Sequence, residues 1–413
     1  MKSRRLMATR PPTLLSAFTG LGGLDLGLEM AGFKNVGCIE FDAAARASIR
    51  ANHPHRRLID PHDITIVGHK LKPAQLGLKR RELFILAGGP PCQPFSKAAQ
   101  WSHRAMQGMK DPRSKCFAGF IHLIESFLPK VVLIENVQGF VSGRAGALTR
   151  LQRSLREINR THGTRYRISQ RIVDAADFGV PQRRSRAIIV ALREGDRFCF
   201  PEPTSADRPV SAWAALRSLS HRTQTKEPLR HWARLLPSIP EGSNYLWHTR
   251  RGGGERLFGY RTRFWSFLLK LAKDAPSWTI SAQPGPYTGP FHWDNRPLTP
   301  AEMLRLQSFP SSWKVRGVRA ARVRQIGNAT PPLLAEVIGR QIAALLLGKK
   351  FRGNPRLAIE HPARKPPPPR APSAAPREFL PLVRRHRDHP GTGLGPAPIP
   401  IQLPDAKKDR QAA

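Results

Sequence analysis

Cysteine and long hydrophobic runs are scarce in this chain of 413 residues. The 4 cysteines, Cys38, Cys92, Cys116 and Cys199, are too few and too far apart for a disulfide framework, and without a CxxC pair they do not indicate a zinc site. No apolar run reaches the roughly 18 residues of a membrane-spanning helix, and no signal-peptide stretch follows the basic N-terminus. We therefore expect a cytoplasmic protein with no metal site and no membrane partner.

Acidic side chains are also few. The chain has 29 Asp and Glu residues against 68 Lys and Arg residues, which gives a formal net charge of +39. Such an excess repels itself in a compact fold unless a polyanion neutralises part of it, so nucleic acid is the expected partner. The length leaves room for one large domain and a smaller one.

Short apolar runs alternate with helical patterns over the first half of the chain. One helical pattern begins after Asp42, a typical N-cap, and ends near residue 52, and another extends from about residue 114 to 128. This alternation predicts an α/β fold with a doubly wound, mostly parallel sheet. The runs with the composition of buried strands are residues 13–18, 36–40, 83–87, 131–135 and 187–192.

Composition also predicts the domain boundaries. Residues 1–195 are expected to form the main domain, and residues 196–295, which are rich in Arg, Trp, Pro and Gly without clear periodicity, a second module. Helical periodicity returns in residues 296–348, which we expect to pack back on the sheet. Residues 349–413 hold 14 of the chain's 40 prolines, and we expect this tail to be disordered.

A glycine cluster follows the first predicted strand directly. Residues 18–23 have the sequence FTGLGG, and Glu40 ends the second predicted strand. Because the carboxyl ends of parallel strands meet at one sheet edge, this arrangement is typical of a nucleoside-cofactor site, where the carboxylate accepts the ribose hydroxyls and an aromatic ring such as Phe18 stacks on the base. The alternative is a glycine-rich surface turn with a solvated glutamate.

Three further groups belong to the same region of the predicted sheet. Cys92, in the proline-stiffened segment GGPPCQPF, is a candidate nucleophile, with a buried structural cysteine as the alternative. Glu135 ends the next strand and is a candidate proton donor, with a helix-capping carboxylate as the alternative. Gln182, Arg184 and Arg186 alternate along an extended segment and would face one side, unless they form a solvated basic face.

In their order along the chain, these segments resemble those of the DNA (cytosine-5)-methyltransferases, the family that includes the bacterial type II restriction-modification methylases. The resemblance covers most of residues 13–348, and Thr330 departs from it where the family commonly has Val. The further segments that carry the resemblance are residues 63–64, 110–113, 176–181, 296–302, 306–310 and 325–332.

The resemblance implies a Rossmann-like, S-adenosylmethionine-dependent catalytic domain and a smaller target-recognition domain. In the implied mechanism, the Cys92 thiolate adds to C6 of a cytosine that is flipped out of double-stranded DNA, and C5 then accepts the methyl group of S-adenosylmethionine. Glu135 would act at N3, Arg186 at O2 beside Arg184, and the loop of residues 97–112 would close over the DNA.

The resemblance also implies a cofactor site, with Asp63 at the adenine edge. The residues expected to surround S-adenosylmethionine are Phe18, Gly20, Leu21, Gly22, Gly23, Glu40, Asp63, Ile64 and Asn328.

The implied partners are double-stranded DNA and, as a functional partner, a cognate restriction endonuclease; the implied state is a nucleoid-associated monomer. Two other functions stay open. The length of the module of residues 196–295 argues against an RNA cytosine-5 methyltransferase, and the presence of Cys92 and Glu135 argues against a catalytically inactive DNA-binding relative. The tail is a DNA-binding arm, a docking strip or a dispensable appendage. The arginines expected to contact guanine or phosphate are Arg250, Arg251, Arg261 and Arg263.

Overall fold

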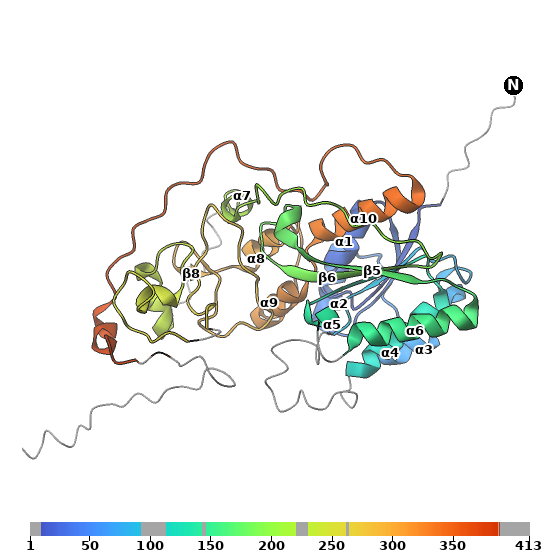
Figure 1. The fold of residues 1–413 in the computed structure, drawn as a ribbon, viewed down its shortest axis with the longest axis horizontal. Helices are drawn as coiled ribbons and strands as arrows, with labels where there is room; N and C mark the ends of the chain where they lie inside the picture. The colour runs from blue at the N-terminus through green and yellow to red at the C-terminus, as the bar shows by residue number, and fades with distance from the viewer. Residues whose placement is uncertain are drawn as a thin grey trace, which may run out of the picture. The chain divides into compact units, whose positions relative to one another are not determined.

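The computed structural model describes residues 10–91, 113–142, 146–219, 230–261, 264–386 and 388, and Figure 1 shows the chain in sequence colours. The chain divides into two compact units. Unit 1 consists of Met1–Leu219, Pro276–Gln283 and Pro300–Ala363, and unit 2 consists of Ser220–Ala275, Pro284–Thr299 and Arg364–Ala413.

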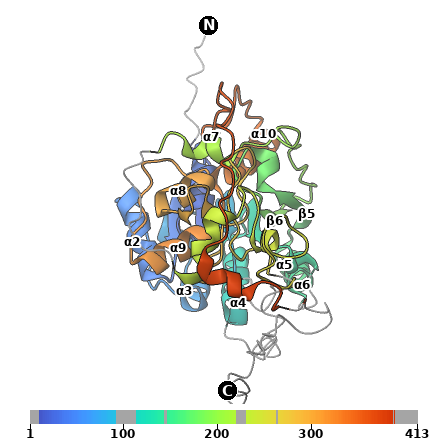
Figure 2. The same ribbon diagram turned by 90° about the vertical axis from the view of Figure 1, so that its left-hand side faces the viewer.

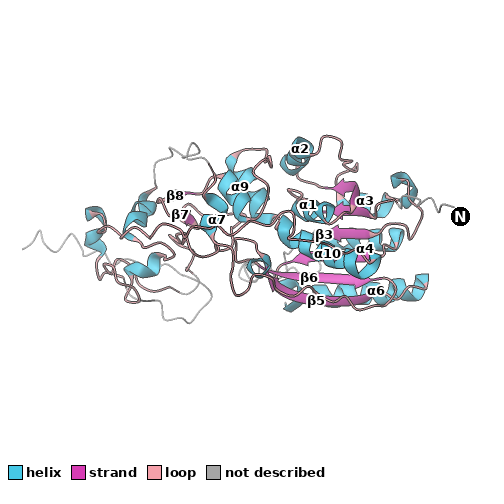
Figure 3. Cartoon of the chain, turned by 90° about the horizontal axis from the view of Figure 1, so that it is seen from above, coloured by secondary structure: helices cyan, strands magenta, loops and turns pink. Residues whose placement is uncertain are grey.

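A 6-stranded sheet forms the centre of unit 1 (Figure 3). The strand order is β2-β1-β3-β4-β6-β5, in which β1 pairs in parallel with β2 and β3, β3 pairs in parallel with β4, and β6 runs antiparallel to β4 and β5. The prediction of a mostly parallel α/β sheet is confirmed, with β6 as the reversed strand. The strands are β1 (Thr13–Ala17), β2 (Lys34–Ile39), β3 (Ile85–Gly88), β4 (Val131–Asn136), β5 (Arg167–Asp174) and β6 (Ser185–Leu192).

Strand β5 has no counterpart among the predicted apolar runs. Its sequence, RISQRIVD, is mostly polar, and its side chains are mostly half-buried or exposed. The cause is its position, because β5 lies at the edge of the sheet and pairs with β6 alone among the strands of the sheet. An edge strand that is open to solvent does not need the continuous apolar sequence of a central strand such as β4.

Helices cover both faces of the sheet (Figure 1). α1 (Gly23–Met30) and α10 (Pro332–Leu347) pack against each other on one face, and a second layer on the other face contributes to the main apolar core. A Cβ added at Gly27 of α1 would lie 2.2 Å from the Pro332 carbonyl oxygen, so the two helices pack too closely for any side chain at this position. The helices of the second layer are α3 (Ile64–Lys70), α4 (Arg113–Phe127) and α6 (Ala147–His162).

The two helices predicted after the second and third strands are confirmed. The first is α2 (Ala43–Asn52), whose N-cap Asp42 accepts a hydrogen bond from the Ala45 backbone N–H at 2.9 Å, and the second is α4. Helix α2 lies beside α9 (Arg319–Asn328), where the Ser48 hydroxyl donates to Gln325 Oε1 at 2.7 Å (Figure 2).

Helices α9 and α10 form the segment that was expected to pack back on the sheet. The stretch Arg319–Leu347 is long enough to cross a membrane and its most apolar 18-residue window has a mean hydropathy of 1.2, but 61% of that window is buried inside the protein. The two helices are also separated at residues 329–331, where Ala329 has extended backbone and Pro331 is outside the helical region. The apolar sequence is therefore that of a core segment.

The boundary of the second module differs from the prediction of residues 196–295. Residues 196–219 belong to unit 1, because the apolar helix α7 (Ala212–Leu216), capped by the Ser211 hydroxyl, packs against α8 (Pro300–Leu306). Residues 276–283 also belong to unit 1, where the Ser277 carbonyl accepts the Arg183 backbone N–H at 2.7 Å. These contacts are long-range, so local composition does not reveal them.

The tail also differs from the prediction of a disordered segment over its described part. Near its start, the buried carboxylate of Glu336 in α10 accepts the backbone N–H groups of Arg356 at 2.7 Å and Leu357 at 2.9 Å. Further along, Phe379 is fully buried in the core of unit 2. A proline-rich segment loses little backbone entropy when it is ordered, so a few well-spaced apolar anchors are enough to hold it.

Unit 2 has a small core and little regular secondary structure. The buried Lys270 amino group connects its loops by donating to the carbonyl oxygens of Leu236 at 3.0 Å and Ile239 at 2.6 Å and to Asn295 Oδ1 at 2.7 Å. Burial lowers the pKa of Lys270 to about 8. The elements of unit 2 are η6 (His231–Ser238), η7 (Tyr245–His248), β7 (Phe291–His292), β8 (Arg296–Pro297) and η8 (Arg377–Leu382).

Candidate active site

A cavity of about 920 Å³ lies within unit 1, next to the carboxyl ends of the parallel strands. One end is built from residues that follow β1 and β2, and the other from residues that follow β3 and β4 and precede β6. Its size is in the range of sites for small molecules and cofactors. The predicted site residues that line it are Phe18, Gly20, Gly23, Glu40, Asp63, Ile64, Glu135, Arg184, Arg186 and Asn328.

The glycine loop after β1 forms the first wall of this cavity. Phe18 and Gly20 both have a φ of 56° and Gly22 has a φ of 84°, so the chain turns three times through the left-handed region. Glycine adopts this conformation without strain, whereas Phe18 does so at some cost. Leu21 is buried and Gly22 caps α1, and these two predicted residues shape the loop without lining the cavity.

Glu40 faces the loop from the end of β2. Its Oε2 accepts the Gly20 backbone N–H at 2.6 Å, and its Oε1 accepts the Asp42 backbone N–H at 2.7 Å. Burial raises the pKa of the Glu40 carboxyl, and these two hydrogen bonds oppose that rise. The carboxyl group is therefore held in one orientation at the cavity wall.

Asp63 and Ile64 stand at the start of α3. Asp63 is the N-cap of that helix, and its Oδ1 accepts both the backbone N–H and the hydroxyl of Thr65 at 2.8 Å. Ile64 is buried beside it. The cap fixes the direction of the Asp63 side chain, so its carboxyl group is a rigid acceptor at this end of the cavity.

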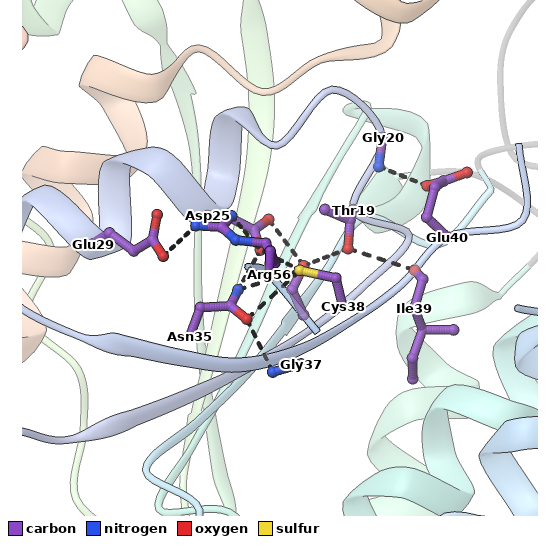
Figure 4. A network of polar contacts seen from close by, with 11 residues as sticks. Thr19, Gly20, Asp25, Glu29, Asn35, Gly37, Cys38, Ile39, Glu40 and Arg56 are labelled. Atoms are coloured by element: carbon purple, nitrogen blue, oxygen red, sulfur yellow. Dashed lines mark hydrogen bonds and ion pairs between the residues drawn. The ribbon is translucent and has the colours of Figure 1, made fainter. Parts of the chain in front are cut away.

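A buried polar network supports the glycine loop from below (Figure 4). Asp25 in α1 is fully buried and accepts from the Ser16 hydroxyl at 2.9 Å and from Asn35 Nδ2 at 2.7 Å. Arg56 Nη1 lies 3.8 Å from Asp25 Oδ1, and Ser16 continues the network to the Thr19 hydroxyl at 2.9 Å. Burial raises the pKa of Asp25, and the charge of Arg56 opposes that rise.

Sequence reasoning missed Asp25 and Arg56. The available signal was an acidic residue, Asp25, on a helix whose neighbours Leu24, Leu26 and Leu28 are apolar. A carboxylate on such a face needs a partner, but nothing local indicates that the partner is Arg56, which follows α2.

Glu135 and Arg186 meet at the other end of the cavity. Glu135 is buried near the end of β4, and Arg186 lies at the start of β6, the antiparallel neighbour of β4. Arg186 Nε is 2.9 Å from Glu135 Oε1, which makes an ion pair. Its angles are not those of a hydrogen bond, so Oε1 has no hydrogen-bond donor within the described part of the chain. Glu135 is therefore placed to bind a group that enters the cavity.

Arg184 is almost completely buried, and only part of its guanidinium is used. Its Nη2 donates to the Gly327 carbonyl oxygen at 2.8 Å, whereas Nε and Nη1 have no hydrogen-bond partner among the residues that the structure describes. Burial lowers the pKa of Arg184, as does the charge of Arg186, and Glu135 opposes these effects. Unpaired buried donors are costly, which is typical of a group reserved for a ligand.

Cys92 and the loop of residues 97–112 lie outside the described residues. The described chain reaches Pro90 and Pro91, both of which line the cavity. Asn136 Nδ2 donates to the Pro90 carbonyl oxygen at 2.8 Å and so holds the segment that leads to Cys92.

Residues 281–283, which composition had assigned to the second module, also line the cavity. They pack against Gly327, where an added Cβ would lie 2.4 Å from the Ala282 Cα atom. No local pattern indicated this contact. Within the described ranges, no group of three His, Cys, Asp or Glu side chains is arranged to hold a metal ion.

Comparison with known proteins identifies relatives of the chain. The family model for C-5 cytosine-specific DNA methylases matches residues 13–344. The type II methyltransferase M.SacI of Streptomyces achromogenes is 33% identical over 366 residues, which cover 80% of this chain and 92% of that protein. M1.HphI of Haemophilus parahaemolyticus, also a type II methyltransferase, is 27% identical and covers 82% of this chain and 89% of its own length.

The fold is similar to that of solved structures. A structure of Spodoptera frugiperda DNMT2 superposes with a TM-score of 0.55 at 15% identity, covering 80% of this chain and 99% of that one.

Proposed function

The chain belongs to the C-5 cytosine-specific DNA methylase family, and from that premise we propose a role for each residue of the cavity. The reaction is the transfer of a methyl group from S-adenosylmethionine to C5 of cytosine in DNA. One end of the cavity holds the cofactor and the other holds the target base. The observation that carries this proposal is the presence of Glu40 and the Glu135–Arg186 pair in one cavity of unit 1.

The residues of the first end fit S-adenosylmethionine. Glu40 presents a fixed carboxyl group that can accept both ribose hydroxyls, and Phe18 offers a ring for the adenine. Asp63, Ile64 and Asn328 also line the cavity, and we assign Asp63 to the adenine edge. When bound, S-adenosylmethionine supplies an electrophilic methyl group.

At the other end, the base is held by Glu135, Arg184 and Arg186. Glu135 Oε1, which has no hydrogen-bond donor among the described residues, binds N3, and the protonated carboxyl group delivers its proton to N3. Arg186 donates to O2, and the unpaired donors of Arg184 stabilise charge that develops on the ring. Together these contacts make C6 electrophilic.

Cys92, two residues after Pro90, is the proposed nucleophile. Its thiolate forms a bond to C6, and the electrons of the C5–C6 double bond make C5 nucleophilic. After C5 is methylated, its proton is lost, the double bond re-forms, the C6–S bond breaks, and the proton returns from N3. Because C6 is inaccessible in a duplex, the target base must first be flipped out.

We further propose that unit 2 is the target-recognition domain and that the substrate is double-stranded DNA. A monomer of the cytoplasm, associated with the nucleoid, would protect host sites against a cognate endonuclease. The relatives named above are type II methyltransferases, which supports this role. Methylation of RNA and a catalytically inactive DNA-binding role are the alternatives that the experiment must exclude.

The test uses the full chain, S-adenosylmethionine and unmethylated plasmid, with 5-methylcytosine mapped by conversion sequencing. We expect the wild-type chain to methylate a single sequence motif and the Cys92→Ala variant to methylate no cytosine. A duplex of that motif with 5-fluorocytosine at the target should then trap the wild-type chain covalently. Methylation of an RNA of the same sequence in preference to the duplex, or activity that survives Cys92→Ala, would overturn the proposal.

A further inference from the structure

The C-terminal segment of residues 373–388, which the structure describes except for residue 387, is bound to the rest of unit 2 near its first residues. The Ser373 backbone N–H donates to the Pro237 carbonyl oxygen at 3.0 Å, and the fully buried Phe379 stacks on Trp232 with ring centroids 5.5 Å apart. Glu378 Oε2 also lies 2.9 Å from Arg234 Nη1. In Figure 1 this is the red segment that contains η8, beside the yellow-green η6.

The far end of the segment is bound to a second loop, residues 250–260. The Arg384 backbone N–H donates to the Arg256 carbonyl oxygen at 3.0 Å. Asp388 Oδ1 accepts the Tyr260 backbone N–H at 2.6 Å, and its Oδ2 lies 2.5 Å from Arg250 Nε. The segment therefore connects η6 to the loop of residues 250–260 and fixes both within the same unit.

These contacts gather arginines from two distant parts of the sequence. Arg384 has a φ of 60°, and the turn there places it against Arg256. Acidic groups nearby are Glu255, which is exposed, and Asp388, which is paired with Arg250. The exposed arginines that result, called the arginine surface below, are Arg250, Arg251, Arg256, Arg384 and Arg385.

Two of these side chains are held in place. The Arg250 side chain is 63% exposed although Asp388 binds its Nε, so its terminal nitrogens stay accessible. The Arg251 guanidinium lies 3.4 Å from the centroid of the Tyr260 ring. Guanidinium groups fixed in this way match the oxygens of a phosphodiester with little further loss of entropy.

We propose that residues 373–388 are an integral part of unit 2, and that Arg384 and Arg385 join the arginine surface to bind the phosphate backbone of duplex DNA. This inference rests on the proposed function only in the assignment of unit 2 to DNA recognition. The surface contacts phosphates on every sequence, so it contributes affinity and register and leaves base selection to other groups. Asp388 is a positioning residue in this surface.

Salt dependence distinguishes a fixed phosphate-binding surface from a loose basic tail. The full-length Arg384→Ala/Arg385→Ala variant should lower the slope of log K against log salt for a duplex by about 1.8, since each lost phosphate contact contributes roughly 0.9. The matched control is Lys407→Ala/Lys408→Ala, which removes the same charge from the end of the tail and should leave the slope within about 0.3 of wild type. Equal slopes in the two variants would overturn the inference.

For Asp388→Asn, the direction of the change in duplex affinity is the test. The change removes a negative charge, so charge alone predicts tighter binding to the duplex, whereas release of Arg250 and Tyr260 predicts weaker binding by about fivefold or more. Unchanged affinity for S-adenosylmethionine and an unchanged melting temperature of unit 1 show that the fold is intact. Tighter duplex binding by Asp388→Asn would contradict the positioning role.

The outcome is separable from the proposed function. If wild type methylates the plasmid and the slopes do not differ, the inference about the arginine surface fails and the proposed function stands. If wild type binds duplex with the expected slopes but does not methylate cytosine, the proposed function fails and the surface stands.

Discussion

Glu135 and Arg186 lie on antiparallel neighbouring strands, with Arg186 Nε 2.9 Å from Glu135 Oε1. The sheet register fixes this pair, because Glu135 is paired with Ile188 and Asn136 with Ala187, which places Arg186 just beyond the end of β4. The reversed direction of β6 therefore matters for the site. A parallel strand at this position would begin beside the amino end of β4, and its first residues would lie far from Glu135.

Glu135→Gln should lower kcat by about 100- to 10,000-fold, because the amide cannot deliver a proton to N3. Affinity for S-adenosylmethionine should be unchanged, since Glu135 lies at the other end of the cavity. Single-turnover methyl transfer on a mapped duplex measures the first quantity and equilibrium binding the second. A variant with wild-type turnover would assign the N3 contact to another residue.

Arg184→Met should separate stability from activity. Removal of a buried cation with unpaired donors is expected to leave stability unchanged or raise it by about 1 to 4 kcal/mol, whereas loss of its charge at the base should cut kcat by roughly 100-fold or more. Thermal unfolding and methyl transfer are the two measurements. Strong destabilisation would show that the bond to Gly327 outweighs the cost of burial.

Binding of S-adenosylmethionine should weaken at acidic pH. Burial raises the pKa of Glu40 above its ordinary value of 4.5, and the ribose hydroxyls need the ionised carboxylate. Affinity is therefore complete above the raised pKa and falls as the pH drops through it, at a higher pH than for an exposed glutamate. Titration of cofactor affinity against pH measures this, and Glu40→Gln should be weaker at neutral pH and show a flatter profile.

The same shift has the opposite sign for folding. A carboxyl group with a raised pKa stabilises the folded state below its unfolded pKa, and that contribution is lost as the pH rises through the folded pKa. Glu40→Gln should thus be at least as stable as wild type at pH 7, as measured by urea unfolding. Destabilisation there would mean that the two backbone hydrogen bonds outweigh burial.

A double-mutant cycle tests the Asp25–Arg56 pair. Arg56→Met leaves the buried Asp25 carboxylate without its cation and should cost about 3 to 5 kcal/mol of unfolding free energy. Asp25→Asn/Arg56→Met should recover part of this loss, because the fully buried Asp25 charge is removed while Glu29, which Arg56 also binds, still loses its partner. If the double variant is as unstable as the sum of the single ones, the two side chains are not coupled.

Gly27→Ala should disrupt the contact between α1 and α10. The added methyl group would meet the Pro332 carbonyl oxygen at 2.2 Å, so we expect a loss of about 1 to 3 kcal/mol in spite of the higher helix propensity of alanine. Gly77→Ala is a control for a glycine with no atom near its added Cβ, although its φ of 68° adds some strain of its own. Urea unfolding of both variants measures the difference.

Local patterns in the sequence predicted the central strands, the helices α2 and α4, and the cavity-lining groups that follow β1 and end β4. These elements are predictable because a buried strand such as β4 needs a continuous apolar run and because a helix such as α2 begins after an N-cap residue. The edge strand β5 lacks such a run, and it was missed for that reason.

What could not be predicted depends on long-range contacts. The partnership of Asp25 with Arg56, the return of residues 276–283 to unit 1 and the binding of Phe379 in unit 2 all join distant positions in the chain. The proline-rich composition of the tail predicts disorder, but a few buried residues such as Phe379 order its described part.

The bond between Arg184 and the Gly327 carbonyl joins the two ends of the cavity through a single peptide step, since Asn328 follows Gly327 directly. We expect this bond to couple occupancy of one end of the cavity to occupancy of the other. If that coupling is favourable, thermodynamic reciprocity requires that the cofactor tightens binding of an extruded cytosine by the same factor by which that cytosine retains the cofactor, and a ternary complex then accumulates in preference to either binary one.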